Sequence, residues 1–302
     1  MSHQINRRTF LKTGSLTTAG VLLAKRSYPE IRGIEPAFVP YDLMQEVRKY
    51  RKLDAYCTAP FNMEQAERLG IDRMYTGKPM IWADWTPDQF IAANDEMIAL
   101  MKRYPGKVVG QITLNPKYGK ESLAEIDRCV DQGMVGTRLY YQVKINDPLY
   151  FPVIEKLTDL KMMIFVHGEA QLGVGGYEMK YDVGRPPTVS RPEDFVEAAI
   201  RYPEAMFQFA HIGGGSDWEY MCKCFADYPN IFVDTGGSNN EADLIDFAVK
   251  LLGEDRLFFG TDNSYFQGVG KILAAELTER QKEKLFFDNY NAVLKKGGYD
   301  VH

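Results

Sequence analysis

Eight short apolar segments alternate with eight segments of helical spacing between residues 50 and 296, and this alternation restricts the possible folds more than any other feature of the chain. Several apolar segments are continuous runs, such as residues 162–166, as expected for parallel strands buried on both faces. Eight strand–helix repeats over about 250 residues predict a closed (β/α)8 TIM barrel. The expected strands cover residues 52–57, 73–76, 108–114, 136–140, 162–167, 206–211, 231–235 and 256–260.

Helices are expected between these strands. Thr86 followed by Pro87 and Asp88 is typical of a helix start, with an N-cap residue before proline at the first helical position. An open, doubly wound sheet is the alternative fold, but no glycine-rich phosphate loop follows the first expected strand. The longest loop, residues 168–191, is expected to cover the carboxyl ends of the strands as a lid. The expected helices cover residues 62–69, 86–105, 121–132, 148–159, 192–202, 216–228, 240–252 and 279–294.

The first 35 residues are predicted to be an export signal and linker that do not belong to the folded domain. Residues 6–12 read Asn-Arg-Arg-Thr-Phe-Leu-Lys, which resembles a twin-arginine export signal. The apolar run at residues 13–24 is too short to span a bilayer, which needs about 20 apolar residues. We therefore expect export to the periplasm, a signal and linker at residues 1–35, and a single barrel domain at residues 36–302. A basic N-terminal arm is the alternative.

Composition and charge exclude several kinds of partner. Lys and Arg number 36 and Asp and Glu number 41, so the net charge of −5 gives no basic surface for nucleic acid. Four cysteines in 302 residues are too few for a disulfide framework. The hydrophobic fraction of 45% supports a sizeable core. The expected partner is a small anionic molecule, with no membrane span, and a homo-oligomer is left open.

Polar side chains gather at the carboxyl ends of the expected strands, where a barrel places its active site. Only four histidines occur in the chain, and the two that are not near a terminus, His167 and His211, end the fifth and sixth strands. Together with Asp262 after the eighth strand, they are the candidate catalytic residues. The other polar residues at strand ends are Asp54, Tyr56, Thr58, Arg138, Glu169, Asp234 and Thr235.

Three of these strand ends resemble landmark motifs of the amidohydrolase superfamily, in its amidohydrolase-related branch. They read Phe-Val-His at residues 165–167, Phe-Ala-His-Ile-Gly-Gly-Gly at residues 209–215 and Phe-Phe-Gly-Thr-Asp at residues 258–262. The resemblance spans about residues 50–296 and implies a barrel of the metal-dependent hydrolase type. Relatives in this branch include decarboxylases, lactonases and hydratases that act on carboxylated ring or enol compounds.

The chain departs from this family at the first strand. The family places Asp-x-His-x-His there, and both histidines are metal ligands, whereas this chain reads Asp54-Ala55-Tyr56-Cys57-Thr58. By the resemblance, His167 and Asp262 match the two remaining ligands, and His211 faces the substrate. Because a catalytic zinc site needs three protein ligands, no cofactor is expected at full occupancy. A weak or rebuilt zinc site remains open, with Asp54, Glu169 or Cys57 as a replacement ligand beside His167 and Asp262.

Four residues are predicted to bind the substrate. Arg138 stands where the family has Lys or Arg, and its guanidinium suits a carboxylate, although a structural ion pair with Asp262 or Glu169 is the alternative. The others are Tyr56, Glu169 and Trp82, the last of which could equally belong to the core.

The expected function is a hydrolase that activates water by acid–base chemistry and cleaves a small carboxylated lactone or a related C–O or C–N bond. Two alternatives remain: a decarboxylase or lyase of the same branch, and a degenerate barrel that acts as an exported binding protein.

Overall fold

The computed structural model describes residues 42–81, 84–170, 172–173, 177–178, 186–215 and 217–301. The export signal expected at residues 6–12 and the candidate pocket residue Trp82 lie outside the described residues, as does much of the loop at residues 168–191. Leu43–His302 forms one compact unit. Among the described helices, none combines the length and apolar character needed to cross a membrane.

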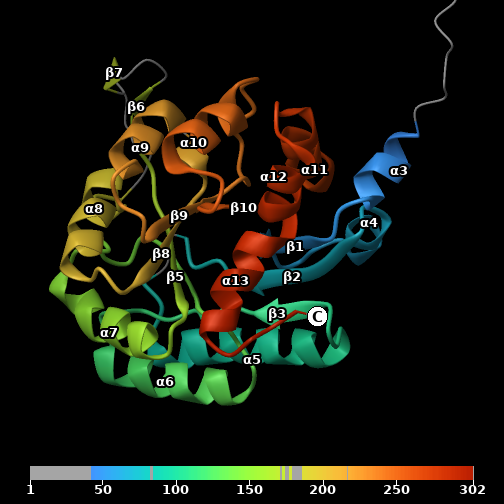
Figure 1. Ribbon diagram of the computed structural model, residues 1–302. Coiled ribbons are helices and arrows are strands. Elements are labelled where there is room, and N and C mark those ends of the chain that lie inside the picture. The colour runs from blue at the N-terminus through green and yellow to red at the C-terminus, as the bar shows by residue number, and fades with distance from the viewer. Residues whose placement is uncertain are drawn as a thin grey trace, which may run out of the picture. The chain divides into compact units, whose positions relative to one another are not determined.

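Eight parallel strands surround the centre of this unit (Figure 1). One sheet has the order β1-β2-β3, and the second has the order β10-β9-β8-β5-β4. A parallel bridge between Ile112 and Thr137 joins β3 to β4, and the N–H of Ala55 in β1 donates to the carbonyl of Phe259 after β10 at 2.9 Å. The strands are β1 Lys52–Thr58, β2 Ile71–Gly77, β3 Val108–Gly110, β4 Thr137–Leu139, β5 Met163–His167, β8 Met206–Ala210, β9 Ile231–Asp234 and β10 Leu257–Phe258.

These two junctions close the ring, so the (β/α)8 barrel is confirmed and the open-sheet alternative is wrong. The expected strands all occur, but several are shorter than the apolar runs that predicted them. Where β1 is paired with β2, the register shifts between Asp54 and Cys57.

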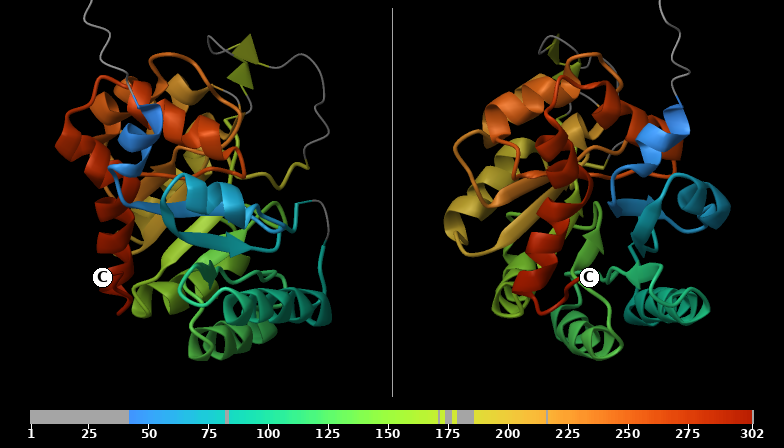
Figure 2. Two further views of the ribbon diagram at one scale, coloured as in Figure 1. Left: turned by 90° about the vertical axis from the view of Figure 1, so that its right-hand side faces the viewer. Right: turned by 45° about the vertical axis from the view of Figure 1, so that its right-hand side comes forward.

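The helices lie outside the barrel, as the two views in Figure 2 show. Helix α5 begins as its sequence predicts, because Pro87 follows the N-cap and the Gln89 side chain accepts the N–H of Thr86 at 2.9 Å. The helices are α3 Leu43–Arg48, α4 Met63–Arg68, α5 Pro87–Arg103, α6 Gly119–Asp131, α7 Phe151–Asp159, α8 Pro192–Arg201, α9 Trp218–Phe225, α10 Leu244–Leu252, α11 Tyr265–Ala274, α12 Glu279–Glu283 and α13 Asn289–Lys296.

Two helices and one pair of short strands are absent from the expectations. Helix α3 precedes the first strand, and α11 follows directly after Asp262. A short antiparallel pair, β6 Leu172–Gly173 with β7 Tyr177–Glu178, lies within the long loop after β5. Of the three, α11 matters most for the site, because it is connected to the strand end that carries Asp262.

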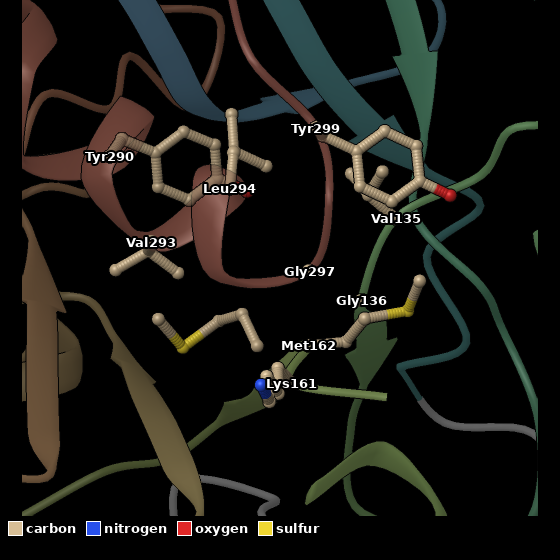
Figure 3. Close-up of a pocket in the computed structure, with 10 residues that line it drawn as sticks. Val135, Gly136, Lys161, Met162, Tyr290, Val293, Leu294, Gly297 and Tyr299 are labelled. Carbon is tan, nitrogen blue, oxygen red and sulfur yellow. The ribbon is translucent and has the colours of Figure 1, made fainter. Parts of the chain in front are cut away.

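The amino ends of the strands are closed by apolar packing. Tyr290, Val293 and Leu294 of α13 belong to one buried cluster with Leu53 and Phe258 of the barrel. A small pocket at this end is lined by residues of α13, of the segment that follows it and of the segments that lead into β4 and β5, among them Tyr299, Val135 and Met162 (Figure 3). The candidate catalytic residues lie at the other ends of the strands, so this pocket is separate from them.

Candidate active site

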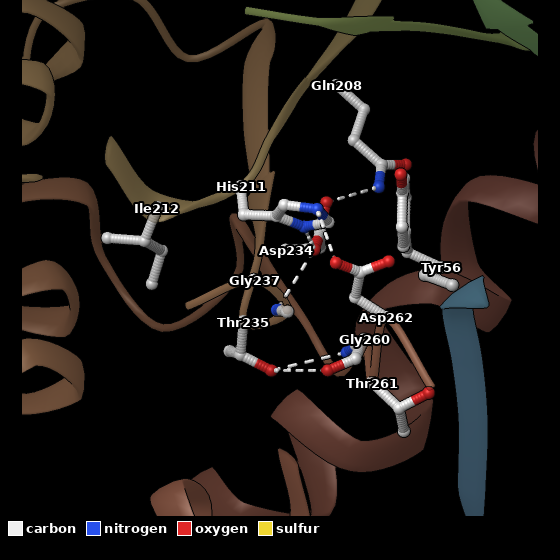
Figure 4. A network of polar contacts seen from close by, with 12 residues as sticks. Tyr56, Gln208, His211, Ile212, Asp234, Thr235, Gly237, Gly260, Thr261 and Asp262 are labelled. Atoms are coloured by element: carbon white, nitrogen blue, oxygen red, sulfur yellow. Dashed lines mark hydrogen bonds and ion pairs between the residues drawn. The ribbon is translucent and has the colours of Figure 1, made fainter. Parts of the chain in front are cut away.

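His211 is held from one side by a buried carboxylate. It follows β8 directly, and its Nδ1 lies 2.5 Å from Oδ1 of Asp234, the last residue of β9 (Figure 4). Asp234 is fully buried and also accepts hydrogen bonds from the Gln208 side chain at 3.1 Å and from the Gly236 N–H at 3.0 Å. Because an ionised carboxylate only accepts, a neutral His211 ring would carry its proton on Nδ1 and leave Nε2 with its lone pair.

Two glycines allow the loop after β9 to approach the imidazole ring. A Cβ atom at Gly236 would lie 2.8 Å from His211 Nδ1, and one at Gly237 would lie 2.8 Å from Cδ2 of the same ring. Gly237 also has a φ of +76°, which favours glycine. The orientation of His211 is therefore fixed by both a carboxylate and backbone contact.

Asp262 faces the free side of His211. Its Oδ2 lies 3.7 Å from His211 Nε2, and its side chain is 39% exposed, so solvent or a ligand can reach this carboxylate. Among the described residues, His211 Nε2 makes no hydrogen bond. A separation of 3.7 Å is too long for a direct hydrogen bond but permits one oxygen atom to contact both groups.

The backbone around Asp262 is held in an uncommon conformation. Asp262 and Asn263 have φ values of +46° and +62°. The N–H groups of Thr261 and Asp262 both donate to the carbonyl of Tyr56, at 3.0 and 2.9 Å. The Asn263 side chain donates to the carbonyl of Thr58 at 2.7 Å and accepts its N–H at 3.0 Å. The end of β1 thus fixes the position of Asp262, as is common for left-handed residues at functional sites.

Tyr56 and Thr58 lie against Arg138 instead of binding an ion. The Arg138 guanidinium carbon is 3.8 Å from the centre of the Tyr56 ring, and Nη2 donates to the Thr58 hydroxyl at 2.7 Å. Its Nε donates to the Tyr140 hydroxyl at 3.1 Å, and Nη1 donates to the carbonyl of Cys57. Arg138 has no exposed surface. Burial raises the pKa of the Tyr56 hydroxyl well above its ordinary value, so this phenol stays neutral.

These contacts change the role that the sequence suggested for Arg138. Each nitrogen of the guanidinium already donates to a protein oxygen, so capture of a substrate carboxylate by a free guanidinium is not the arrangement present. The alternative, an ion pair with Asp262 or Glu169, is not formed either: no carboxylate of the described residues lies within ion-pair distance of Arg138. Direct carboxylate binding by Arg138 stays a prediction that would need a rearranged side chain.

His167 lies in a second polar group at the end of β5. The Tyr141 hydroxyl is 2.7 Å from His167 Nδ1 and donates to Glu169 Oε1 at 3.0 Å. The His167 ring stacks on Tyr140, with ring centres 5.6 Å apart, and lies 5.4 Å from the His211 ring. The three catalytic candidates therefore share one end of the barrel, and Glu169 contacts His167 through Tyr141.

The side chains of the described residues form no set that fits a resident divalent metal. Within the described ranges, no group of three or more His, Cys, Asp and Glu residues is arranged to hold an ion. Asp54, expected as a replacement ligand, is fully buried and accepts the Thr261 hydroxyl at 2.6 Å and the Thr261 N–H at 3.0 Å. Cys57 packs in the core between the strands and the helices. The donors that the structure describes therefore form no rebuilt zinc site.

Asp234, Tyr140 and Tyr141 are site residues that were not assigned a role from the sequence. Asp234 stood among the polar strand ends, and the signal that could have selected it is its position one strand beyond His211. Tyr140 and Tyr141 follow β4 directly, but two consecutive aromatic residues after a strand are equally typical of a core. Thr58 was noted at a strand end, and its contact with Arg138 gives it a place in the site.

Comparison with known families agrees with the barrel. The amidohydrolase family model (Amidohydro_2) matches residues 77–294 of the 302 residues. The chain therefore belongs to the amidohydrolase family, as the motifs at residues 165–167, 209–215 and 258–262 indicated.

Solved structures with the same barrel include several decarboxylases. A 2,6-dihydroxybenzoate decarboxylase from Rhizobium has a TM-score of 0.63 and 16% identity, with 82% of this chain and 98% of that chain covered. The 5-carboxyvanillate decarboxylase from Sphingomonas paucimobilis has a TM-score of 0.62 and 16% identity, with 78% and 82% covered. A dihydroxybenzoic acid decarboxylase from Polaromonas sp. JS666, with bound manganese and the inhibitor 2-nitroresorcinol, has a TM-score of 0.60 and 17% identity, with 77% and 84% covered. At these identities the likeness shows a shared fold.

Proposed function

We propose that this protein is a hydrolase that opens a small carboxylated lactone, or cleaves a related C–O or C–N bond, by acid–base activation of water. The observation that carries the proposal is the line of Asp234, His211 and Asp262. In this line a buried carboxylate fixes one nitrogen of the imidazole, and the other nitrogen faces a partly exposed carboxylate at 3.7 Å. Groups in this arrangement can share a proton with one water molecule.

The proposed reaction needs no group beyond water and these side chains. Asp262 takes a proton from water as the water oxygen bonds to the carbonyl carbon of the substrate, and the carbonyl electron pair moves onto its oxygen. When the carbonyl re-forms, the ring C–O bond breaks, and the same proton passes to the departing oxygen. The His211 Nε2 lone pair accepts a hydrogen bond from the water and can hold the proton in transit, because Asp234 stabilises a positive charge on the ring.

Decarboxylation is the second candidate, and it is favoured by the decarboxylases among the solved structures that share the barrel. In that reaction the C–C bond to the carboxylate breaks, CO2 leaves, and the electron pair stays on the ring carbon, which takes a proton from protonated Asp262. The same residue would then act as an acid instead of a base. The two candidates differ in their product, since only decarboxylation releases CO2.

The test is a substrate screen with both products measured. Small lactones, including dihydrocoumarin and carboxylated butyrolactones, are assayed by proton release at constant pH, and 2,6-dihydroxybenzoate and 5-carboxyvanillate are assayed for CO2. We expect proton release without CO2, and a loss of this activity in Asp262→Asn. Release of CO2 by the wild-type protein, but not by Asp262→Asn, would favour the decarboxylase. If no compound turns over while small anions raise the melting temperature, the binding-protein alternative is favoured.

We also propose that the protein is exported by the twin-arginine route, on the sequence of residues 6–12. Replacement of both Arg7 and Arg8 by Lys keeps the charge and should abolish appearance of the protein in the periplasm, measured by cell fractionation. An undiminished periplasmic pool of the Lys-Lys variant would contradict the proposal.

A further inference from the structure

We infer that Arg138 is the fixed cation of this site, and that the hydroxyl groups of Thr58 and Tyr140 transmit its polarising effect to the carbonyl oxygen of the substrate. The part of this inference that concerns the substrate rests on the proposed hydrolase. The part that concerns the cation does not, because it makes a separate statement about metal binding.

The first observation is a buried positive charge with no carboxylate among its described contacts. Arg138 is 0% exposed, and it donates to one carbonyl and two hydroxyl groups. Its guanidinium also lies over the Tyr56 ring at 3.8 Å. A guanidinium stays charged at any pH that the protein tolerates, and buried charges are normally paired. A buried cation with no carboxylate within ion-pair distance among the described residues, at the catalytic end of a barrel, is well suited to a substrate in which negative charge develops.

The second observation concerns the hydrogens of the two hydroxyl groups. A guanidinium has no acceptor, so Thr58 and Tyr140 must accept from Arg138 and direct their own hydrogens elsewhere. The Thr58 hydroxyl is 3.5 Å from Asp262 Oδ1, and the Tyr140 hydroxyl is 3.3 Å from that of Tyr56. Both distances are well beyond the usual 2.7–2.8 Å for O–H···O bonds. These two donors are therefore polarised by a cation and only weakly engaged by protein partners.

The third observation is where the two donors lie. Thr58 is next to Asp262, the proposed base, and Tyr140 stacks on His167. If Asp262 activates the attacking water, the carbonyl oxygen of the substrate lies at the same end of the barrel as the Thr58 and Tyr140 hydroxyl groups. Hydroxyl donors placed before the reaction begins stabilise the developing oxyanion without reorganisation. Thr58 and Tyr140 would thus be catalytic residues, and Arg138 a positioning residue that acts through them.

The Arg138 charge also opposes metal binding at the end of the first strand. Tyr56 and Thr58, at the two positions where the first strand lacks histidine, both contact the guanidinium, at 3.8 Å to the ring centre and 2.7 Å to the hydroxyl. A divalent ion bound between them would lie against a full positive charge. We expect a positive residue 138 to weaken Mn²⁺ binding by restored histidines at positions 56 and 58.

The kinetic test separates the inferred role from direct carboxylate binding. Tyr140→Phe and Thr58→Val should each lower kcat by roughly 10- to 100-fold and leave KM within about threefold, because an oxyanion donor acts in the transition state. Tyr150→Phe is the matched control: it removes a fully buried hydroxyl that has no hydrogen-bond partner among the described residues, and it should leave both constants unchanged. A rise in KM at constant kcat for both site variants would overturn the inference.

The metal test does not depend on activity. Tyr56→His with Thr58→His is made with Arg, Lys or Gln at position 138, and each protein is titrated with Mn²⁺ by calorimetry after a check of folding by circular dichroism. The Gln version should bind Mn²⁺ at least about tenfold more tightly than the Arg and Lys versions, since only Gln removes the charge. Arg138→Met replaces Gln if that version does not fold. Equal affinity in the charged and neutral versions, tight or weak, would overturn the assignment of Arg138 as the fixed cation. If the Gln version binds Mn²⁺ more tightly but no substrate is hydrolysed, the proposed hydrolase function is refuted and the assignment of Arg138 as the fixed cation stands.

Discussion

The two sides of the catalytic end are built from different chemistry. On the side of β8, β9 and β10, carboxylates and an imidazole are arranged around a 2.5 Å contact between His211 and Asp234. On the side of β1 and β4, a buried guanidinium is surrounded by the hydroxyl groups of Thr58 and Tyr140. The first side can move protons, whereas the second can only present positive charge and hydrogen-bond donors. We therefore propose that this barrel transfers protons on the first side, although its first strand carries no histidine at positions 56 and 58.

The largest effect is expected from the proton-transfer side. Asp262→Asn should lower kcat by roughly 100-fold or more and leave KM nearly unchanged, because general base catalysis typically contributes 10²- to 10⁴-fold. Steady-state kinetics on the substrate from the screen measure this. Asp127→Asn removes a carboxylate that is 61% exposed on α6 and serves as the control, with no change expected. A mild effect of Asp262→Asn, equal to that of the control, would remove Asp262 from the mechanism.

The next effect concerns the orientation of His211. Asp234→Asn should lower kcat by roughly 10- to 100-fold, because an amide can donate to Nδ1 and so stabilise the wrong tautomer. Gln208→Leu, which removes a second contact of Asp234 without touching the imidazole, should cause a smaller loss. For both variants, kcat is measured as a function of pH and the two profiles are compared. Equal losses in the two variants would show that Asp234 acts only through packing.

A third change tests the backbone contact on the same ring. Gly236→Ala places a Cβ atom within 2.8 Å of His211 Nδ1 and 2.9 Å of Asp234 Oδ1, so the imidazole must shift. We expect a loss of about 1–3 kcal/mol in the free energy of unfolding and a lower kcat. Gly270→Ala, on α11 with open space around its Cβ position, is the control for the added methyl group. Denaturation in urea and steady-state kinetics give both quantities, and wild-type values for Gly236→Ala would show that the loop adjusts freely.

The smallest effect is expected from Asp54, a buried carboxylate in β1 that lies between the two sides of the catalytic end. Burial raises the pKa of Asp54 to about 8, although hydrogen bonds from Thr261 and Tyr56 oppose the shift. The folded protein then holds a proton that the unfolded chain releases above its ordinary pKa near 3.9, so stability falls as pH rises from about 4 to about 8. Asp54→Asn should flatten this dependence, with a difference of about 1 kcal/mol or more between pH 5 and pH 8. Parallel urea titrations at the two pH values decide it, and an unchanged slope would contradict the shifted pKa.

The sequence predicted the barrel well because the fold depends on a repeated pattern. Eight apolar runs and the Thr86-Pro87 helix start are local signals, and the structure confirms each of them. Helix α11 was not expected, because Gly268 and Gly270 weaken its helical signal, and its position depends on packing of Gly268 against Gly260.

The site was predictable only in part for a physical reason. His167, His211 and Asp262 end separate strands, and closure of the barrel brings strand ends together. The environment of Arg138 could not be read from the sequence, because its contacts with Thr58 and Tyr140 depend on the side-chain directions of β1 and β4. Asp54 likewise shows no sequence signal that its carboxylate is engaged by Thr261.

Turnover by protein freed of metal tests the central claim most directly. The protein is dialysed against EDTA, and its metal content and kcat are measured on the same sample, before and after addition of Mn²⁺. We predict well under one metal ion per chain, full activity after dialysis and no gain with Mn²⁺, because Arg138 supplies the positive charge of the site. Loss of activity on dialysis, with recovery in proportion to bound Mn²⁺, would contradict the account.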